Sequence, residues 1–404
     1  MAHTLTEIEG GVTAPRGFTA AGLHCGIKAN GKPDLALVVS DAPATAAAVF
    51  TTNQAQAAPV LLSMAHLAAT TGRARAVITN SGCANACTGP QGMTDASEMV
   101  ALTAAALGCV DNEVLVASTG VIGVNLKMAS LRSGIPLAVA ALSSDGGADA
   151  AIGIMTTDPF PKSAAVEVVT AAGTFRVGGM TKGSGMIEPR MATMLGYLTT
   201  DAAVDAVRLR QVLVEACRFT FNAITVDGEP STNDCVFALA NGASGVTIDD
   251  ATEAALFEGV RTVARTLALG IVRGGEGATK LVAMTVTGAE TDADAWMAAR
   301  AIANSLLVKT AVHGADPNWG RLIAASGRSG ARFVLEQARV QIGDLVMFEG
   351  GRPFDERAPE AAHYLKGSDL AISVDLGTGG PFSATVWTCD LSKMYVQINA
   401  EYRT

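Results

Sequence analysis

Apolar residues recur along this chain with two spacings, and each spacing predicts one type of element. Short apolar runs or strict alternation are typical of buried or half-buried β-strands. We expect strands at 35–39, 46–51, 76–79, 114–117, 166–170, 174–177, 194–198, 281–287, 338–342, 369–375, 383–389 and 395–398. The segments 166–170 and 174–177 are separated by the short connection of a β-hairpin.

Apolar residues three or four positions apart predict amphipathic helices between these strands. The clearest case places Leu256, Val260 and Val263 on one face. Helices are expected at 94–107, 135–142, 206–219, 254–269 and 294–307. At the start of the first, Asp95 and Glu98 are spaced as in a capping box. The mixture predicts an α+β fold in which helices are layered on mixed or antiparallel sheets.

Composition narrows the class of protein. The chain has 404 residues, of which 49% are hydrophobic and 17% charged, and this length suits two domains or one large layered domain. The net charge of −9 argues against nucleic acid or an anionic membrane surface as a partner. No uncharged apolar run reaches the ~18 residues of a membrane span, and the first residues lack the pattern of a signal or transit peptide. We therefore expect a cytoplasmic protein.

Cysteine and histidine spacing gives little sign of a metal or a disulfide framework. The seven cysteines are an odd number at scattered positions, which favours free thiols in a reducing compartment. The five histidines form no HExxH pattern and no close pair, so a metal site or a Ser–His–Asp triad has little support. We expect no metal and no resident cofactor.

The segment from Lys182 to Thr193 is the most informative part of the chain. Glycines and Pro189 make it turn-prone, and it ends at an Ala192–Thr193 bond directly before the apolar run 194–198. Thr193 can be a half-buried strand residue and nothing more. It can also attack the carbonyl of Ala192, cut the chain, and become an amino-terminal nucleophile whose α-amine, with a pKa of about 7.7–8.0, is its own base.

Other segments have both a chemical and a plain structural interpretation. In the glycine-punctuated turn expected at 118–123, the Thr119 hydroxyl and the Gly120 N–H can form a two-donor oxyanion hole, or the turn is ordinary. The loop from Arg273 to Lys280 carries Glu276 between two cations, and can hold a charged substrate or face solvent. The polar stretches 80–89, 227–234 and 398–404 fit binding loops or plain turns and a frayed end.

Taken together in order, these segments resemble the glutamate N-acetyltransferase family, also called ornithine acetyltransferase, of arginine biosynthesis. The matching segments are the loop at 80–89, then 118–123, 155–158, 182–195, 227–234, 274–280, 314–321 and the tail 399–404. The sequence departs from the family pattern at Cys83 and at Glu188 and Arg190. The resemblance implies self-cleavage between Ala192 and Thr193 and a fold of the autoprocessing N-terminal-nucleophile-like type. The products would be an α chain, 1–192, and a β chain, 193–404.

The resemblance also assigns roles to individual residues. It makes Thr193 the nucleophile and gives the oxyanion hole to Thr119 and Gly120. It lines the substrate site with Thr156, Lys182, Thr193, Glu276, Asn399 and Thr404. Lys182 would pair with a substrate carboxylate, and Glu276 would attract a substrate ammonium. Thr156, Asn399 and Thr404 would donate or accept hydrogen bonds at the amino-acid end or at the acyl group.

The implied reaction is ping-pong transfer of acetyl from N2-acetyl-L-ornithine to L-glutamate through an acetyl ester of Thr193. Acetyl-CoA is a further candidate donor, which would make the enzyme bifunctional, and two copies of each chain fit the family. Two rival functions stand beside this one. One is a self-processed amidase or aminopeptidase, in which water replaces glutamate. The other is a non-catalytic amino-acid-binding protein, which the intact set of site residues argues against.

Overall fold

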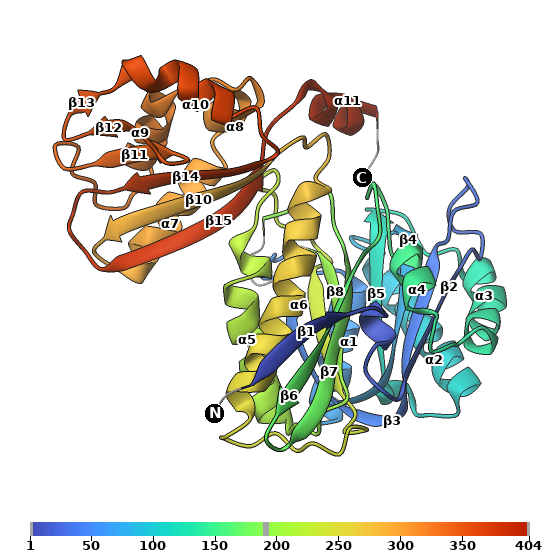
Figure 1. Ribbon diagram of the computed structural model, residues 1–404. Coiled ribbons are helices and arrows are strands. Elements are labelled where there is room, and N and C mark those ends of the chain that lie inside the picture. The colour runs from blue at the N-terminus through green and yellow to red at the C-terminus, as the bar shows by residue number, and fades with distance from the viewer. Residues whose placement is uncertain (1–2, 189–193, 402–404) are drawn as a thin grey trace.

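Two sheets organise the chain, and they belong to a larger and a smaller body (Figure 1). The computed structural model describes residues 3–188 and 194–401. The larger body holds a nine-stranded sheet, in which β1-β6-β7-β8-β9-β3-β4-β5 are neighbours in that order and β2 pairs with β3. Its strands are β1 Thr4–Ile8, β2 Phe18–Leu23, β3 Leu35–Phe50, β4 Arg73–Cys83, β5 Val114–Val121, β6 Lys162–Thr170, β7 Gly173–Lys182, β8 Leu195–Thr200 and β9 Cys235–Ala240.

The long strand β3 makes the larger sheet fold over on itself. Its first half pairs with β2 and β4, its register shifts between Val39 and Ala44, and its second half pairs with β9. Alternate side chains of the second half enter different cores: Ala47 and Val49 pack toward the helices, whereas Ala46 lies in a core between the two halves of the sheet. Strands buried on both faces read as nearly continuous apolar runs, which is the pattern seen in this sequence.

Helices cover both outer faces of the folded sheet and complete four layers. On one face, α5 (Ala206–Arg218) and α6 (Glu253–Arg273) pack on β3, β6 and β7. The opposite core is closed by α1 (Ala58–Ala69), α2 (Gly89–Leu107) and α3 (Met128–Ala140), while α4 (Gly147–Gly153) packs against β2 and β3. The predicted α+β fold with helices layered on sheets is therefore confirmed.

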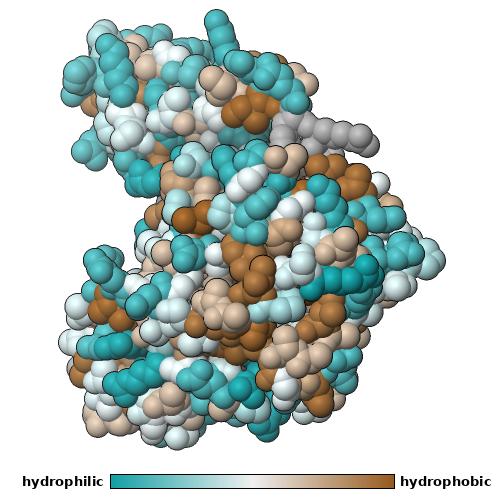
Figure 2. Space-filling view, turned by 90° about the vertical axis from the view of Figure 1, so that its right-hand side faces the viewer, coloured by the Kyte–Doolittle hydropathy of each residue, from teal (hydrophilic) through white to brown (hydrophobic). Residues whose placement is uncertain are grey.

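The smaller body comes entirely from the second half of the chain. Its six-stranded sheet has the order β13-β12-β11-β14-β10-β15. The strands are β10 Leu281–Ala289, β11 Arg339–Ile342, β12 Leu345–Glu349, β13 Arg352–Pro353, β14 Asp369–Asp375 and β15 Phe382–Cys389. The helices are α7 Asp292–Ala303, α8 Leu306–His313, α9 Trp319–Gly327 and α10 Ala358–Tyr364. Figure 2 shows the smaller body as a largely hydrophilic lobe above the larger one, on which apolar residues gather in the centre of the view.

The predicted elements were mostly right in type and less accurate in their ends. The strand expected at 395–398 is wrong, because this segment lies in the helix α11 (Lys393–Glu401). The expected helix at 294–307 is two helices, interrupted where Ser305 caps α8 through the Val308 N–H. Helix α2 begins at Gly89, so Asp95 lies inside it and makes no capping box. The turn expected at 118–123 is strand as far as Val121.

The boundary at 192/193 does not separate the two bodies. Strands β7 and β8, which flank residues 189–193, pair antiparallel in the middle of the larger sheet. Residues before and after this point therefore share one core, and the division into an α and a β chain stays a prediction. Of the helices in the described part of the chain, none is long and apolar enough to cross a membrane.

Candidate active site

A cavity of about 350 Å³ opens where β5, β7 and the start of β8 meet the loops that follow α6 and precede β9. Its described lining includes six of the predicted site residues, namely Thr119, Gly120, Thr156, Lys182, Glu276 and Asn399. Met194 lines it as well, next to the undescribed segment 189–193. The predicted Ala192, Thr193 and Thr404 lie outside the described residues. A cavity of this size suits a small ligand such as an amino-acid derivative.

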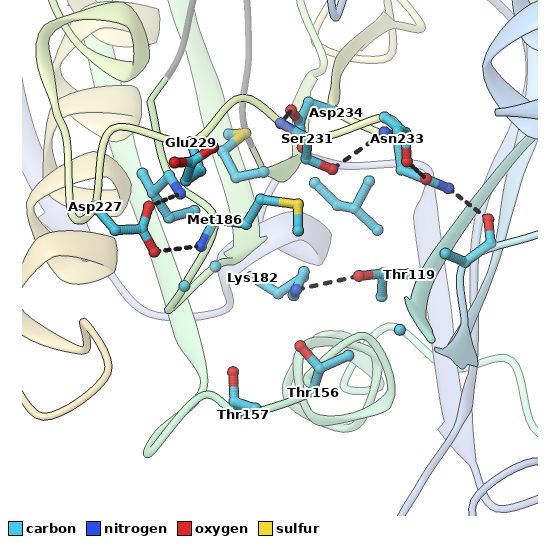
Figure 3. A pocket seen from close by; sticks show the side chains of 18 of the residues that line it. Thr119, Thr156, Thr157, Lys182, Met186, Asp227, Glu229, Ser231, Asn233 and Asp234 are labelled. Carbon is cyan, nitrogen blue, oxygen red and sulfur yellow. Dashed lines mark hydrogen bonds between the residues drawn. The ribbon is translucent and has the colours of Figure 1, made fainter. Parts of the chain in front are cut away.

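Lys182 and Thr119 face each other across this cavity (Figure 3). Lys182 is the last residue of β7, Thr119 lies in β5, and both side chains are buried. The Lys182 ammonium donates to the Thr119 hydroxyl oxygen at 3.1 Å. Since that hydroxyl accepts from an ammonium, which has no acceptor to offer in return, its own proton is free to donate to a ligand oxygen. The arrangement fits the predicted role of Thr119 as an oxyanion donor.

Gly120 is in a backbone conformation that other residues rarely adopt. Its φ is +129°, and a Cβ placed there would lie 2.3 Å from the carbonyl carbon of Gly82 on β4. The close approach of β4 and β5 thus leaves no room for a side chain at this position. Gly120 lines the cavity beside Thr119, as the oxyanion-hole prediction requires.

Asp158 holds two walls of the cavity together. One carboxylate oxygen accepts from Lys162 Nζ at 2.6 Å and from the Gly183 N–H at 2.7 Å, and the other accepts from the Thr156 N–H at 3.1 Å. Burial alone would raise the pKa of this carboxyl. The charges of Lys182 and Lys162 and the hydrogen bond from Gly183 outweigh burial and hold the pKa below its ordinary value. Asp158 therefore stays ionised and fixes the loop of Thr156 to the end of β7.

A second carboxylate, Asp227, holds the chain just before the undescribed segment. Its two oxygens accept the N–H groups of Met186 at 2.7 Å and Ile187 at 2.8 Å (Figure 3). It also accepts the Tyr395 hydroxyl of α11 at 3.1 Å. Asp227 thus links the residues just before the predicted cleavage site to the carboxyl-terminal helix α11.

Helix α11 closes one side of the cavity through a second polar contact. Asn399 donates its side-chain amide to Glu276 at 2.8 Å. Glu276 follows the end of α6, and its N–H donates to the Ser184 carbonyl at 2.9 Å. Glu276, Asn399 and the glycine-rich segment at Ser184 therefore form one wall of the cavity, although they are far apart in sequence.

Acidic side chains outnumber basic ones among the described residues of the cavity, and two of the acidic residues lie away from Thr119 (Figure 3). Of the lining residues that the structure describes, Lys182 alone is basic, whereas Asp227, Glu229, Asp234 and Glu276 are acidic. Burial raises the pKa of Asp234 well above its ordinary value despite the opposing charge of Lys182. Asp227 and Glu229 lie on the opposite side of the view from Thr119 in Figure 3. A ligand with a carboxylate at one end and ammonium groups at the other would match this distribution of charge.

The structure also adds site residues to which the sequence reasoning gave no role. Asp158 and Asp227 belong to the matching segments 155–158 and 227–234 without a role of their own, and Tyr395 begins the segment predicted as a strand. Asn233 also lines the cavity, and its side-chain amide donates to the carbonyls of Ala84 at 2.6 Å and Ser118 at 2.9 Å. The only signal for these residues in the sequence is a polar side chain in or near a glycine-rich segment. The sequence does not show which distant group each side chain contacts. Within the described ranges, no group of three His, Cys, Asp or Glu residues could hold a metal ion.

Comparison with known proteins identifies the family. A model of the ArgJ family matches residues 19–404. This chain belongs to the ArgJ family. The arginine biosynthesis bifunctional protein ArgJ of Symbiobacterium thermophilum is 52% identical, over 98% of this chain and 99% of that protein. A protein of the same name from Synechococcus is 50% identical over 98% of each chain.

A solved structure is also similar to part of this chain. The ornithine acetyltransferase of Mycobacterium tuberculosis, crystallised with ornithine, is 47% identical over a region that covers 47% of this chain and 100% of that chain, with a TM-score of 0.43. The family membership confirms the resemblance that the sequence motifs indicated. The curated relatives are named as bifunctional proteins of arginine biosynthesis, which agrees with the predicted enzyme.

Proposed function

We propose that this ArgJ family member cuts itself between Ala192 and Thr193 and then transfers acetyl from N2-acetyl-L-ornithine to L-glutamate. The observation that carries the proposal is the hydrogen bond between Lys182 and Thr119, in a cavity that Glu276 and Asn399 also line. A Lys182 ammonium can pair with a substrate carboxylate, and the hydroxyl it contacts can donate to a reacting oxygen. The relatives named for arginine biosynthesis and ornithine acetyltransfer support the choice of substrates.

Self-cleavage requires a reacting bond that is held at both ends. On the amino-terminal side, Asp227 binds the N–H groups of Met186 and Ile187. On the carboxyl-terminal side, the Met194 carbonyl accepts from the Cys235 N–H at 3.0 Å. In the proposed cut, the Thr193 hydroxyl attacks the Ala192 carbonyl carbon, and the amide C–N bond breaks to give an ester. Water then hydrolyses the ester, which returns the Thr193 hydroxyl and leaves a carboxylate on Ala192. The cut frees the α-amine of Thr193, which becomes the base for the transfer.

Acetyl transfer then proceeds in two half-reactions. The Thr193 oxygen attacks the acetyl carbonyl of acetylornithine, the amide C–N bond breaks, and the Thr193 α-amine passes the hydroxyl proton to the departing ornithine nitrogen. The neutral amine of glutamate next attacks the acetyl ester, the ester C–O bond breaks, and a proton returns to the Thr193 oxygen. Thr119 and Gly120 donate to the oxyanion in both steps, and each such donor typically contributes about 2.7–4 kcal/mol.

Substrate orientation follows from the distribution of charge. The carboxylate of either amino acid pairs with Lys182, and an ammonium of ornithine pairs with Glu276. Thr156, Asn399 and Thr404 complete the polar contacts. The word bifunctional in the names of the relatives favours acetyl-CoA as a second acetyl donor, which makes glutamate acetylation independent of acetylornithine. Two copies of each chain form the assembly in this proposal.

Intact-mass measurement of the purified protein, with Thr193→Ala beside it, tests the proposal. We expect two pieces from the wild type and one uncut chain without transferase activity from the variant. Incubation with acetylornithine should add one acetyl group to the carboxyl-terminal piece of the wild type. A wild-type chain that is active while uncut would refute the proposal. Release of ornithine at the same rate with and without glutamate would instead indicate a hydrolase.

A further inference from the structure

Glu188 is the last described residue before the segment 189–193, and its side chain is almost fully buried. Only 4% of the side chain is exposed. One carboxylate oxygen accepts from Arg300 at 2.8 Å, and the other accepts from the Asn304 amide at 3.0 Å. Both oxygens therefore have a partner, which a buried carboxylate needs if it is to stay charged.

The two partners of Glu188 are themselves fixed to the chain beside it. Arg300, in α7, also donates to the carbonyl of Asn222 in the short 3-10 helix η3 (Phe221–Ala223). The Asn304 side-chain oxygen accepts from the Thr225 hydroxyl at 2.7 Å. That hydroxyl also lies 3.1 Å from the carbonyl of Ile187. The Glu188 side chain and the Ile187 backbone thus share one network.

This network joins parts of the chain on opposite sides of position 193. Arg300 and Asn304 are 112 and 116 residues away from Glu188 in sequence. They connect the end of the first half to the smaller body, which belongs wholly to the second half. In the described part of the chain, the other side-chain ion pair across this boundary is Arg16–Asp201, at 4.0 Å with Arg16 largely exposed.

The placement of the network has a chemical consequence. Cleavage within one chain depends on holding the attacking hydroxyl and the attacked carbonyl in a reactive geometry, and a misplacement of about 1 Å can cost about 100-fold in rate. Asp227 holds the backbone of residues 186 and 187. Glu188 adds the anchor that is nearest to residues 189–193 on their amino-terminal side, and because it acts through its side chain, mutation can remove it.

We propose that Glu188, held by Arg300 and Asn304, is a positioning residue for self-cleavage, and that the same contacts tie the two pieces together after the cut. This inference rests on the proposed cleavage between Ala192 and Thr193. It assigns to position 188 a role in the rate of processing, while the transfer reaction uses other residues.

The test follows cleavage of newly made protein over time by denaturing gel and intact mass, at a temperature well below unfolding. We expect Glu188→Ala and Arg300→Ala to be cut about 10- to 100-fold more slowly than the wild type. The charge-swapped double variant Glu188→Arg/Arg300→Glu should recover part of the rate. Arg16→Ala, which removes the other ion pair across the boundary, should be cut at the wild-type rate.

Two further measurements separate positioning from general stability. Val263→Ala, in the buried face of α6, destabilises the larger body without touching the network. If it slows cleavage as much as Glu188→Ala at equal loss of thermal stability, the positioning role is refuted. Glu188→Ala enzyme that has finished cleavage should keep the wild-type kcat, and its pieces should separate at lower urea concentration.

The outcomes also distinguish this inference from the proposed function. Wild-type protein that is never cut refutes self-cleavage and the positioning role together. Wild-type protein that is cut, beside a Glu188→Ala variant that is cut equally fast, refutes the positioning role alone.

Discussion

The Lys182 ammonium lies 3.1 Å from the Thr119 hydroxyl oxygen, so the end of β7 is joined to β5 inside the cavity. The bond sets the direction of the hydroxyl proton, because an ammonium can only donate. A cation proposed to bind the substrate and a hydroxyl proposed to stabilise the oxyanion are therefore coupled. Changes at either residue should affect acetyl transfer more strongly than folding.

Replacing Thr119 by Val keeps the shape of the side chain and removes the donor. We expect kcat for transfer from acetylornithine to glutamate to fall about 100- to 1000-fold. Thr119→Ser keeps the hydroxyl and should stay within about tenfold of the wild type. Steady-state assays on fully cut protein provide the comparison. Near wild-type turnover of Thr119→Val would exclude the hydroxyl as an oxyanion donor.

Gly120→Ala should disturb the fold as well as the reaction. The added Cβ would lie 2.3 Å from the carbonyl carbon of Gly82, and the φ of +129° is strained for any other residue. Each such strain costs about 1–3 kcal/mol. Gly123→Ala is the matched control. Its φ of +80° is also a conformation that favours glycine, but no atom lies within 4 Å of the added Cβ, so it lacks the steric clash. Thermal unfolding should show a clearly larger loss at position 120, and equal losses would contradict the close approach.

Asp158→Asn should lower stability at neutral pH by about 3–5 kcal/mol, because it leaves the buried ammonium of Lys162 without its charged partner. The folded state lowers the pKa of Asp158, so this carboxylate contributes stability above its unfolded pKa, and the contribution is lost as pH falls below about 4. Urea unfolding in the uncut Thr193→Ala background measures both effects in a single chain. We expect Asp158→Asn to cost less unfolding free energy in acid than at neutral pH. A cost that grows in acid would contradict a lowered pKa of Asp158 in the folded state.

Glu276→Gln tests the acidic end of the cavity. The amide keeps the size of the side chain and can still contact Asn399, but it removes the charge that attracts an ammonium. A charge-assisted hydrogen bond contributes about 1.5–3 kcal/mol, so we expect KM for acetylornithine to rise about 10- to 100-fold. The effect on kcat should be smaller. A fall in kcat with unchanged KM would indicate a role in the chemical step instead.

The sequence predicted the layered α+β class because its core elements show two clear patterns of apolar residues. These are apolar runs or alternation in the strands, and a spacing of three or four positions in the helices. Helix α5 and strand β14 were placed within a residue of their observed ends. The prediction for 395–398 failed because a short apolar run cannot distinguish a strand from a helix, and α11 has no buried residue to show its period. Strand β3 was predicted as two strands because its irregular middle contains a register shift.

The candidate site was predictable where one segment carries its own chemical signal. Glycines around Thr119 and Lys182 marked two walls of the cavity, and the charged loop 273–280 indicated Glu276. The family resemblance added Asn399 and gave both residues a role. Asp158 and Asp227 could not be found in this way, because their roles depend on N–H groups of distant segments that only the folded chain brings near. Arg300 gave no signal at all, since its partner Glu188 is 112 residues away.

The pairing of β7 with β8 has a consequence for how such a protein must be made. The new ends created by the proposed cut would lie in sequence between β7 and β8, two central strands that pair from Lys182–Leu195 to Val177–Thr200. Assembly must therefore come first and scission second. If the two pieces were made as separate chains, β8 in the second piece would lack its partner β7 along one edge, and an exposed strand edge of that kind favours aggregation.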